Sequence, residues 1–309
     1  MDTGMIIAFL AAVVALGTPI LLAAAGEMVA ERSGILNLGV EGMMLVGAVT
    51  GVIVTLKTGN HWAGISAAMA AGGVVSLIHA FISVTLNGNQ VVSGLALTLF
   101  GTGLSGFVGM KYVGVPVANP FEPWSIPLLS KIPYLGPVLF HQDSLVYLSY
   151  LVVIGLYLML YKTAWGLSLR AVGEDPAAAD ATGISVSRIR YLATMIGGML
   201  AGLGGAYLSL AFTPAWMEGM TAGRGWIAVA LVIFGMWDPV KILAGSYLFG
   251  TVEALNYRFQ TLGITVPSFF LQMLPYVLTI LAVFLAVRVK GKEAGPPAAL
   301  STPYDRESR

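Results

Sequence analysis

The stretch "ERSGILNLGVEGMMLVGA", residues 31–48, places Asn37 and Glu41 inside a segment that otherwise has the composition of a membrane helix. A carboxylate in hydrocarbon costs several kcal/mol, so such a side chain faces a bundle interior or a water-filled cavity. Asn37 and Glu41 are four residues apart, which puts them on one face of a helix and within reach of each other. Gly39 and Gly42 flank the carboxylate and weaken the helix there. The stretch predicts a broken membrane helix with polar groups turned inward.

The composition of the whole chain is that of a membrane protein. Of its 309 residues, 57% are hydrophobic and only 10% are charged, against about 25% charged in ordinary soluble domains. The mean hydropathy is +0.84. A formal net charge of +1 gives no field that would recruit nucleic acid. Cysteine is absent, which excludes disulfides, thiolate metal sites and a cysteine nucleophile.

The apolar runs set the expected number of membrane helices, since a spanning helix needs roughly 20 mostly apolar residues. Such runs lie at residues 5–25, 34–56, 62–86, 91–112, 144–161, 191–213, 224–237, 242–260 and 268–287. Gly, Asn or Ser interrupts two of them and the seventh is short, so these helices can be broken or re-entrant. The predicted fold class is an all-α integral membrane protein, a polytopic bundle of about nine to ten transmembrane helices within residues 1–289.

The positions of lysine and arginine predict the orientation, because cytoplasmic loops are enriched in both. With the N-terminus outside, eleven of the sixteen lie on the inner side and five on the outer side. The inner residues are Arg32, Lys162, Arg170, Arg188, Arg190, Lys241, Arg288, Lys290, Lys292, Arg306 and Arg309, and the outer ones are Lys57, Lys111, Lys131, Arg224 and Arg258. We therefore expect the N-terminus outside and the C-terminus in the cytoplasm.

Two segments outside the apolar runs are rich in proline. Residues 113–143 carry prolines at 116, 120, 123, 127, 133 and 137, which exclude a continuous helix and predict a folded extracytoplasmic loop. This loop is either an ordinary connector or a docking surface for a partner. Residues 290–309 are polar and contain prolines, which predicts a disordered cytoplasmic tail.

The cytoplasmic loop at residues 163–190 predicts one short helix outside the membrane. Asp175 stands where an N-cap belongs, Pro176 occupies the first helical position, and Gly183 can end the helix in the left-handed conformation. An isolated helix of about two turns is unstable in water, so it must pack on something. Two alternatives remain for the surface on which this helix packs: this protein's own inner surface, and a groove in a partner.

Catalytic motifs are missing from the sequence. The chain has no GxxxxGK[ST] phosphate loop, no HExxH and no GxSxG, and its histidines at 61, 79 and 141 are scattered. We therefore predict no enzyme, no catalytic residue and no metal site. Active transport by this chain would draw on an ion gradient or on another subunit. An ion-coupled secondary transporter is the alternative of another class, although such carriers usually show several carboxylates in one site and an inverted repeat.

The candidate ionisable side chains within the spans are Glu41, His79 and Glu253. Asn256 follows Glu253 by three residues and forms a pair like that of Asn37 and Glu41. His79 has no such neighbour and is expected to be a packed side chain. For the two Glu/Asn pairs, two interpretations stay open: a buried polar clasp between helices, and a polar lining for a hydrophilic solute.

Small residues recur at a spacing of four, which lets membrane helices approach closely. They are Gly47 with Gly51, Gly198 with Gly202, Ser246 with Gly250, and Gly101 with Ser105 and Gly109. This spacing predicts a tight bundle.

Three long blocks resemble a known family. They are "GEMVAERSGILNLGVEGMMLVGA" (26–48), "GLSLRAVGEDPAAADATGISVSRIRYLATMIGGMLAGLGGAYL" (166–208) and "GRGWIAVALVIFGMWDPVKILAGSYLFG" (223–250). They are similar to the membrane permease of bacterial ABC importers, in the branch that serves simple sugars, nucleosides and branched-chain amino acids. The resemblance covers nearly the whole chain. The first block is most similar to the nucleoside-type permeases.

The resemblance implies an assembly. Such permeases lie in the bacterial inner (plasma) membrane, pair with a second permease subunit, carry cytoplasmic ATPases and receive solute from an extracytoplasmic binding protein. The second permease is expected to be a different chain, with an identical one as the alternative. The chain itself would then bind no cofactor and no nucleic acid, and partner subunits would hydrolyse ATP.

In that scheme the helix from Asp175 to Gly183 matches the coupling helix of the family, which sits in a groove of the ATPase. The residues that the motif carries over to ATPase coupling are Arg170, Gly173, Glu174, Asp175, Pro176, Ala178 and Gly183. Arg170, Arg188 and Arg190 flank this element and are expected to contact the ATPase or lipid phosphates.

The implied solute is a nucleoside, with a monosaccharide or a branched-chain amino acid as the alternative. A nucleoside is neutral, so a fitting path offers a few amide or carboxylate acceptors and aromatic surfaces. The candidate residues of the translocation pathway are Asn37, Glu41, Gln90, Trp226, Phe234, Glu253 and Asn256, with Asn37 and Glu41 as the leading pair.

Overall fold

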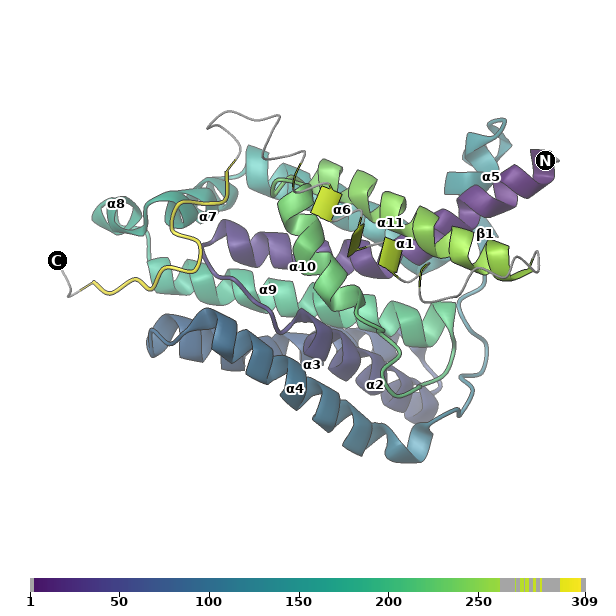
Figure 1. Cartoon of the computed structure of the whole chain (residues 1–309), viewed down its shortest axis with the longest axis horizontal. Coiled ribbons are helices and arrows are strands. Elements are labelled where there is room, and N and C mark those ends of the chain that lie inside the picture. Colours follow the sequence, from purple (N-terminus) through teal and green to yellow (C-terminus); the bar gives the residue numbers. More distant parts are fainter. Residues whose placement is uncertain are drawn as a thin grey trace.

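The computed structural model describes residues 3–261 and 295–306, and between them residues 270, 273, 274, 276, 277, 280, 281 and 284. Six helices in this part are long and apolar enough to cross a membrane (Figure 1). They are Thr3–Arg32, Val40–Thr58, His61–Thr85, Gln90–Tyr112, Ser144–Lys162 and Val186–Phe212. The prediction of an all-α polytopic membrane protein is confirmed. The apolar run at 268–287 lies mostly outside the described residues, so the total of nine to ten spans stays a prediction.

The elements follow one another along the chain. The first four helices are α1 (Thr3–Arg32), α2 (Val40–Thr58), α3 (His61–Ala80) with the π-turn η1 (Phe81–Thr85), and α4 (Gln90–Gly109) with the 3-10 turn η2 (Met110–Tyr112). A loop follows with β1 (Trp124–Ser125), η3 (Leu129–Lys131), α5 (Leu135–Leu139) and β2 (His141–Gln142). The remaining elements are α6 (Ser144–Lys162), α7 (Ala164–Glu174), α8 (Pro176–Ala181), α9 (Val186–Tyr207), η4 (Leu208–Phe212), α10 (Arg224–Phe234) and α11 (Pro239–Thr261).

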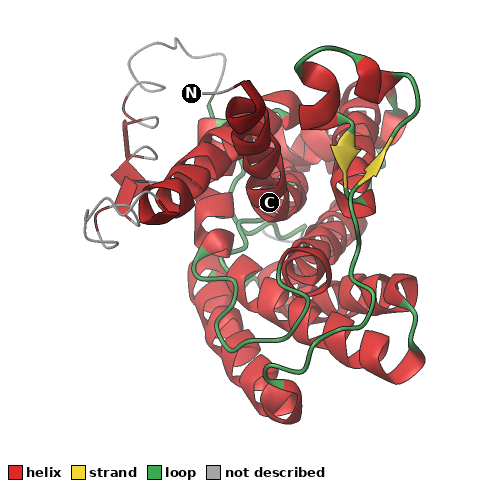
Figure 2. Ribbon diagram, turned by 90° about the vertical axis from the view of Figure 1, so that its right-hand side faces the viewer, coloured by secondary structure: helices red, strands yellow, loops and turns green. Residues whose placement is uncertain are grey.

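Helix α9 lies at the centre of the bundle, where it packs against α1, α2 and α3. The N-terminus, α5 and β1 lie at one end, whereas α7, α8 and the last described residues lie at the opposite end (Figure 1). We call these the α5 end and the α8 end. Figure 2, viewed from the α5 end, shows the two short strands on the near side. Helices α2 and α10 both begin in the middle of the bundle (Figure 1).

Short polar side chains start most of the long helices. The Oδ1 atom of Asn60 accepts from the N–H groups of Trp62 and Ala63 at the start of α3. Asn89 does the same for α4, Asp143 for α6 and Thr163 for α7. These caps satisfy N–H groups that have no partner inside the helix. Local sequence therefore sets where these helices begin.

Glycines hold the helices in main-chain contact, as their spacing predicts. A Cβ atom at Gly47 would overlap the carbonyl of Gly202, and one at Gly198 would overlap the carbonyl of Gly72. A Cβ atom at Gly101 would lie 2.6 Å from the Cα atom of Gly42. In a bilayer this close approach is a main source of helix association. The predicted tight bundle is confirmed for these contacts.

The two proline-rich segments both form ordered structure in their described parts. In the loop at 113–143, β1 and β2 pair antiparallel, with Trp124 opposite Gln142. The tail differs from the disorder expected for 290–309, because residues 295–306 lie against the α8 end. There the N–H of Ala299 donates to the carbonyl of Gly173 and that of Ser301 donates to the carbonyl of Gly34. Composition alone could not indicate these main-chain partners, which lie far away in the sequence.

Helix α10 is too short to cross a membrane alone. Its eleven residues rise about 16 Å, whereas the hydrocarbon core is about 30 Å thick. The run predicted at 224–237 is therefore a broken span. The predicted span at 34–56 is also interrupted, because residues 33–39 are not helical and α2 begins only at Val40.

Candidate functional site

The interruption between α1 and α2, residues 33–39, runs through the bundle interior with its backbone satisfied. The N–H groups of Gly34 and Ile35 donate to carbonyls of the last turn of α1, and the N–H of Asn37 donates to Glu27 Oε1 at 2.8 Å. The carbonyl of Leu38 accepts from Thr98 Oγ1 at 2.8 Å. Irregular backbone at membrane depth requires such partners, because lipid offers none. The interruption is therefore a stable part of the fold, held by these hydrogen bonds.

Gln90 and His79 hold the same break from α4 and α3. Gln90 Oε1 accepts from the N–H of Leu36 at 2.8 Å, and His79 Nε2 lies 3.0 Å from the carbonyl oxygen of Leu36. The other ring nitrogen of His79 lies 3.0 Å from Ser93 Oγ. The expectation that His79 is a packed side chain is confirmed. Gln90 is buried and supports the backbone of the interruption.

Asn37 stands before helix α2, so the expected helical pair with Glu41 does not form. Its Oδ1 atom accepts from the N–H of Gly39 at 2.9 Å, and its Nδ2 atom lies 3.5 Å from the sulfur of Met43. This Asx-type turn competes with helix and delays the start of α2. The i, i+4 rule applies only inside a helix, which explains why the predicted pairing is wrong.

Glu41 instead binds the start of α10, more than 180 residues along the chain. Its Oε1 atom accepts from Thr221 Oγ1 at 2.6 Å and from the N–H of Gly223 at 2.9 Å. Its Oε2 atom accepts from the N–H of Gly225 at 2.6 Å. The side chain is only 8% exposed. A carboxylate at a helix N-terminus meets unpaired N–H groups and the positive end of the helix dipole.

Two glycines make this contact possible. Gly223 has φ +82°, a left-handed conformation that favours glycine. A Cβ atom at Gly225 would lie 2.5 Å from both the main-chain nitrogen and the Cα atom of Glu41. The first turn of α10 therefore rests directly on the first turn of α2.

Arg224 forms an ion pair beside the residues that bind Glu41. Its Nη2 atom lies 3.1 Å from Glu253 Oε2, and its Nη1 atom donates to the carbonyls of Met220 and Thr221. The two side chains are 10% and 18% exposed, so water screens this pair only partly. We call the group formed by Glu41, Thr221, Arg224 and Glu253 the break cluster.

The seven predicted pathway residues do not all lie in one place. Glu41 and Glu253 meet in the break cluster through Arg224, and Trp226 lies half-buried on the first turns of α10. Asn256 is half-buried one turn beyond Glu253 on α11. Phe234 lies at the far end of α10, where its ring faces Gly245. Asn37 lies in the interruption of residues 33–39, and Gln90 supports that interruption from α4.

Sequence analysis missed several residues that shape this region. Thr221 and Arg224 were not assigned to it, and Arg224 was counted only as an outer charge. Glu27 and Glu31 lie in the last turns of α1, beyond the hydropathy run that ended at residue 25. The spacing in "GEMVAERSG" held a signal, because two glutamates four residues apart are neighbours on a helix and like charges there destabilise it.

The loop between α6 and α9 forms the predicted capped helix. Asp175 Oδ1 accepts from the N–H of Ala178 at 3.0 Å, and Pro176 occupies the first turn of α8. Gly183 has φ +89° just after the helix. Asp175 and Ala178 are exposed, and Ala179 is buried against the bundle. The helix therefore presents a small, exposed surface at the α8 end (Figure 1).

Four other residues of this loop contact their own chain. A Cβ atom at Gly173 would overlap the carbonyl oxygen of Arg32, so α7 lies directly on the end of α1. Glu174 Oε2 accepts from the N–H of Ala298 at 3.4 Å. The guanidinium of Arg170 lies 5.4 Å from the ring centre of Tyr161. Arg190 is buried and donates to the carbonyls of Ser33 and Thr302, so it does not reach a partner or lipid as expected.

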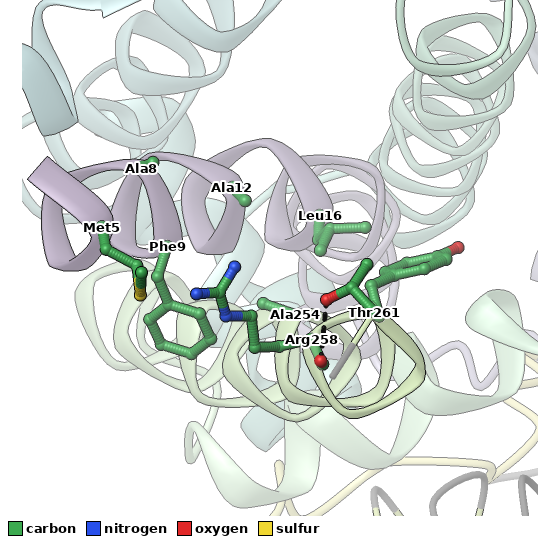
Figure 3. Close-up of a pocket in the computed structure, with 9 residues that line it drawn as sticks. Met5, Ala8, Phe9, Ala12, Leu16, Ala254, Arg258 and Thr261 are labelled. Carbon is green, nitrogen blue, oxygen red and sulfur yellow. Dashed lines mark hydrogen bonds between the residues drawn. The ribbon is translucent and has the colours of Figure 1, made fainter. Parts of the chain in front are cut away.

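Pockets in the described part of the chain lie outside the break cluster, and two of them border α1 and the α8 end. An apolar pocket of about 240 Å³ lies between α1 and the end of α11, and Figure 3 shows Arg258 reaching across it from α11 toward α1. A polar pocket of about 360 Å³ lies at the α8 end, between η1, the start of α9 and the tail. Neither pocket includes a residue of the break cluster.

Comparison with known proteins agrees with this architecture. Residues 9–286 match the family described as "Branched-chain amino acid transport system / permease component". The chain belongs to this family of ABC permeases. It is 42% identical over 320 aligned residues to the "Putative glucose ABC transporter permease protein TsgC13" of Haloferax volcanii, which covers 96% of this chain and 97% of the relative. It is 35% identical to the "Guanosine ABC transporter permease protein NupQ" of Bacillus subtilis, with 94% of both chains covered.

More distant similarities extend the comparison. The chain is 25% identical to a second glucose permease of Haloferax volcanii and to a second guanosine permease of Bacillus subtilis, over 74% and 87% of its length. It shares a fold with a solved ABC transporter in an inward-facing conformation, at a TM-score of 0.51 and 13% identity, with 90% of this chain and 85% of that one covered.

Membership in this family confirms several of the predictions made from the sequence. The protein is a multi-pass membrane permease of an ABC importer and not an enzyme, and a partner ATPase hydrolyses the ATP. An extracytoplasmic binding protein is the other implied partner. Because the relatives come from both archaea and bacteria, the expectation of a bacterial inner membrane is narrower than the family.

Proposed function

We propose that this permease forms one half of the translocation path for a nucleoside. The observation that carries the proposal is the break cluster, where two broken helices meet through Glu41 in the interior of the bundle. Interrupted helices in transporters commonly mark the place where solute passes, because their ends expose polar groups at membrane depth. The relative named for guanosine supports the choice of solute.

The charges of the break cluster favour a neutral solute. Both oxygens of Glu41 already accept hydrogen bonds, and Arg224 is paired with Glu253. Charged groups that are committed to each other offer little to an ion or a zwitterion, so a branched-chain amino acid fits less well. Hydroxyl groups can still use the spare lone pairs of the carboxylates.

In this proposal, burial assigns six of the seven pathway candidates to two roles. The half-buried residues Trp226, Glu253 and Asn256 offer an aromatic face, a carboxylate and an amide to the solute. The buried residues Asn37, Glu41 and Gln90 position the two broken helices. Phe234 narrows the α8 end of the path.

A monosaccharide is the second candidate solute. The relative that is 42% identical is named for glucose. Glucose and the ribose of a nucleoside both present hydroxyl groups, so the polar part of the path serves either one. The two differ in the base, which needs an aromatic or apolar surface such as that of Trp226.

The second permease of the complex is proposed to be a different chain. In two organisms this sequence is similar to two permeases named for the same solute, at 42% and 25% in one and at 35% and 25% in the other. One close and one distant relative per organism is the pattern expected of a heteromeric pair.

Helix α8 is proposed to bind the ATPase, with the N-terminus outside and the C-terminus in the cytoplasm. Its exposed residues Asp175 and Ala178 would enter a groove of that subunit, and Pro176 and Gly183 fix where the helix starts and ends. Arg170, Gly173 and Glu174 support the helix from behind through their contacts with Tyr161, α1 and the tail.

One reconstitution tests the function. The permease pair, the ATPase and the binding protein are placed in vesicles, and ATP-dependent uptake of labelled guanosine, glucose and leucine is compared. We expect uptake of guanosine that stops without ATP or without the binding protein. Uptake of glucose alone would replace the first candidate with the second. Uptake without ATP that follows an ion gradient would refute the importer reading.

A further inference from the structure

Two carboxylates in α1 have no part in the proposed path. Glu27 and Glu31 lie one helical turn apart, and each is 1% exposed. Their carboxyl groups are within hydrogen-bonding reach of each other. Side chains four residues apart on a helix are direct neighbours, so any charge on one acts strongly on the other.

Each carboxyl group uses one oxygen to accept a hydrogen bond from a different irregular segment of the bundle. Glu27 Oε1 accepts from the N–H of Asn37 at 2.8 Å, in the interruption between α1 and α2. Glu31 Oε2 accepts from the indole Nε1 of Trp237 at 2.5 Å, in the turn between α10 and α11. In that turn Met236 and Trp237 both have positive φ, at +52° and +54°. The carboxyl pair thus ties together the two irregular segments of the bundle.

The remaining oxygens, Glu27 Oε2 and Glu31 Oε1, are buried and meet no donor in the part of the chain that the structure describes. A buried acceptor without a partner is costly, and two such atoms on neighbouring side chains are unusual in a native interior. A proton on one of them would turn the pair of acceptors into a donor and an acceptor.

No cation of the surrounding helices neutralises the pair within the described residues. The two ion pairs found there are Arg224 with Glu253 and Arg306 with Asp180. The other charged groups around α1 have other neighbours or are exposed. Among the cations, Arg32 donates to the carbonyl of Trp237, Arg190 donates to the carbonyls of Ser33 and Thr302, and Arg170 lies over the ring of Tyr161, while Lys162 and Lys241 are exposed. Among the acids, Asp238 accepts from Tyr161 and Glu41 accepts from the start of α10.

We propose that Glu27 and Glu31 form a proton-binding site, in which one proton is shared between Glu27 Oε2 and Glu31 Oε1. Two ionised carboxylates one helical turn apart and shielded from water would repel each other strongly, because little solvent lies between them to screen the charges. One bound proton removes that repulsion and gives both orphan oxygens a partner. The site therefore carries a single negative charge when occupied.

The proton at this site controls how firmly the interruption of residues 33–39 and the turn between α10 and α11 are held together. With the proton bound, the carboxyl groups attract each other and keep Asn37 and Trp237 at a fixed separation. Loss of the proton reverses this attraction, and the repulsion acts directly on the interruption and on the strained turn. The complex should therefore loosen when the site loses its proton.

Infrared spectroscopy of the intact complex tests the proposal. At neutral pH the wild type should show a carbonyl band of a protonated carboxylic acid that shifts in D₂O. Glu31→Gln is a close mimic of the protonated state, because its amide oxygen can accept from Trp237 while its NH₂ group donates to Glu27. We expect the band to be lost in Glu31→Gln and, independently, in Glu27→Gln. Glu253→Gln is the matched control and should keep it. A flat difference spectrum between wild type and both variants would overturn the proposal.

The pH dependence of unfolding gives a second readout. Loss of the shared proton replaces the attraction between the two carboxyl groups with repulsion, so stability should fall as pH rises through the point where the proton leaves. Glu31→Gln should flatten this decline, whereas Glu253→Gln should leave it in place. An unchanged decline in Glu31→Gln would refute the proton site. A stability that follows sodium concentration, with both carboxylates ionised, would likewise replace the proton by a metal cation.

Discussion

Replacing Glu41 by glutamine should loosen the contact between α2 and α10 while the protein still folds. The carboxylate accepts three hydrogen bonds, two at Oε1 and one at Oε2. A glutamine retains the oxygen that faces Thr221 and Gly223 but turns an NH₂ group toward the N–H of Gly225. That N–H then lacks an acceptor, which costs about 1–3 kcal/mol. Loss of the charge beside the helix N-terminus adds up to about 2 kcal/mol.

The expected total is therefore about 1–5 kcal/mol, a large part of the roughly 5–15 kcal/mol that stabilises a typical protein. Thermal unfolding in detergent should show a clear drop in Tm for Glu41→Gln. Thr221→Val is the matched control, because it removes one donor and leaves none unpaired, so about 0.5–1.5 kcal/mol is expected. Glu41→Leu removes all three hydrogen bonds and should cost more than either.

ATP-dependent uptake links the same variants to function. If Glu41 positions the start of α10, Glu41→Gln should fold, insert and transport poorly. A Tm equal to that of the wild type would refute the energetic part of the reasoning. Normal uptake by Glu41→Leu would refute the role of this position in the path.

Three other perturbations test separate parts of the fold. Gly225→Ala should destabilise the protein by about 1–3 kcal/mol in thermal unfolding, because its Cβ atom would meet the main chain of α2 at 2.5 Å, while Gly103→Ala, with nothing within 4 Å, should not. Changing Asp175 and Pro176 together to glycine should weaken co-purification of the ATPase and leave membrane insertion intact; unchanged co-purification would count against the coupling role. Removal of residues 295–309 should lower the Tm, since it takes away main-chain partners at the α8 end, and an unaltered Tm would show that the tail adds no stability.

Local patterns predicted most of the helices correctly. Apolar runs located the six spans, three of them to within one residue at each end and the other three to within seven, because hydropathy is a property of each segment alone. The cap at Asp175 followed from three neighbouring residues, and the structure has that cap. Small residues four apart predicted the close contacts at Gly47 and Gly198, since only small side chains permit them.

The site depended on contacts that a single sequence does not show. Glu41 was expected to pair with Asn37 four residues away, whereas its partners stand 180 to 184 residues away. Asn37 ends up outside the helix because its side chain accepts from its own backbone two residues on. Glu27 and Glu31 lay just beyond an apolar run, and only the packing of α10 and α11 shows that they are buried.

The α8 end is joined to the interruption of residues 33–39 by main-chain contacts, and this decides how movement can pass between them. Helix α7 touches the carbonyl of Arg32 at Gly173, with no side chain between the two backbones. The tail then bridges the same two elements, since Ala299 bonds Gly173 and Ser301 bonds Gly34. A rotating side chain can absorb a small displacement, but a backbone pressed on a backbone cannot, because close-packed interiors have two arrangements rather than a continuous range. A shift of α7 and α8 must therefore displace Arg32 and Gly34, and with them the start of the segment that ends at Glu41.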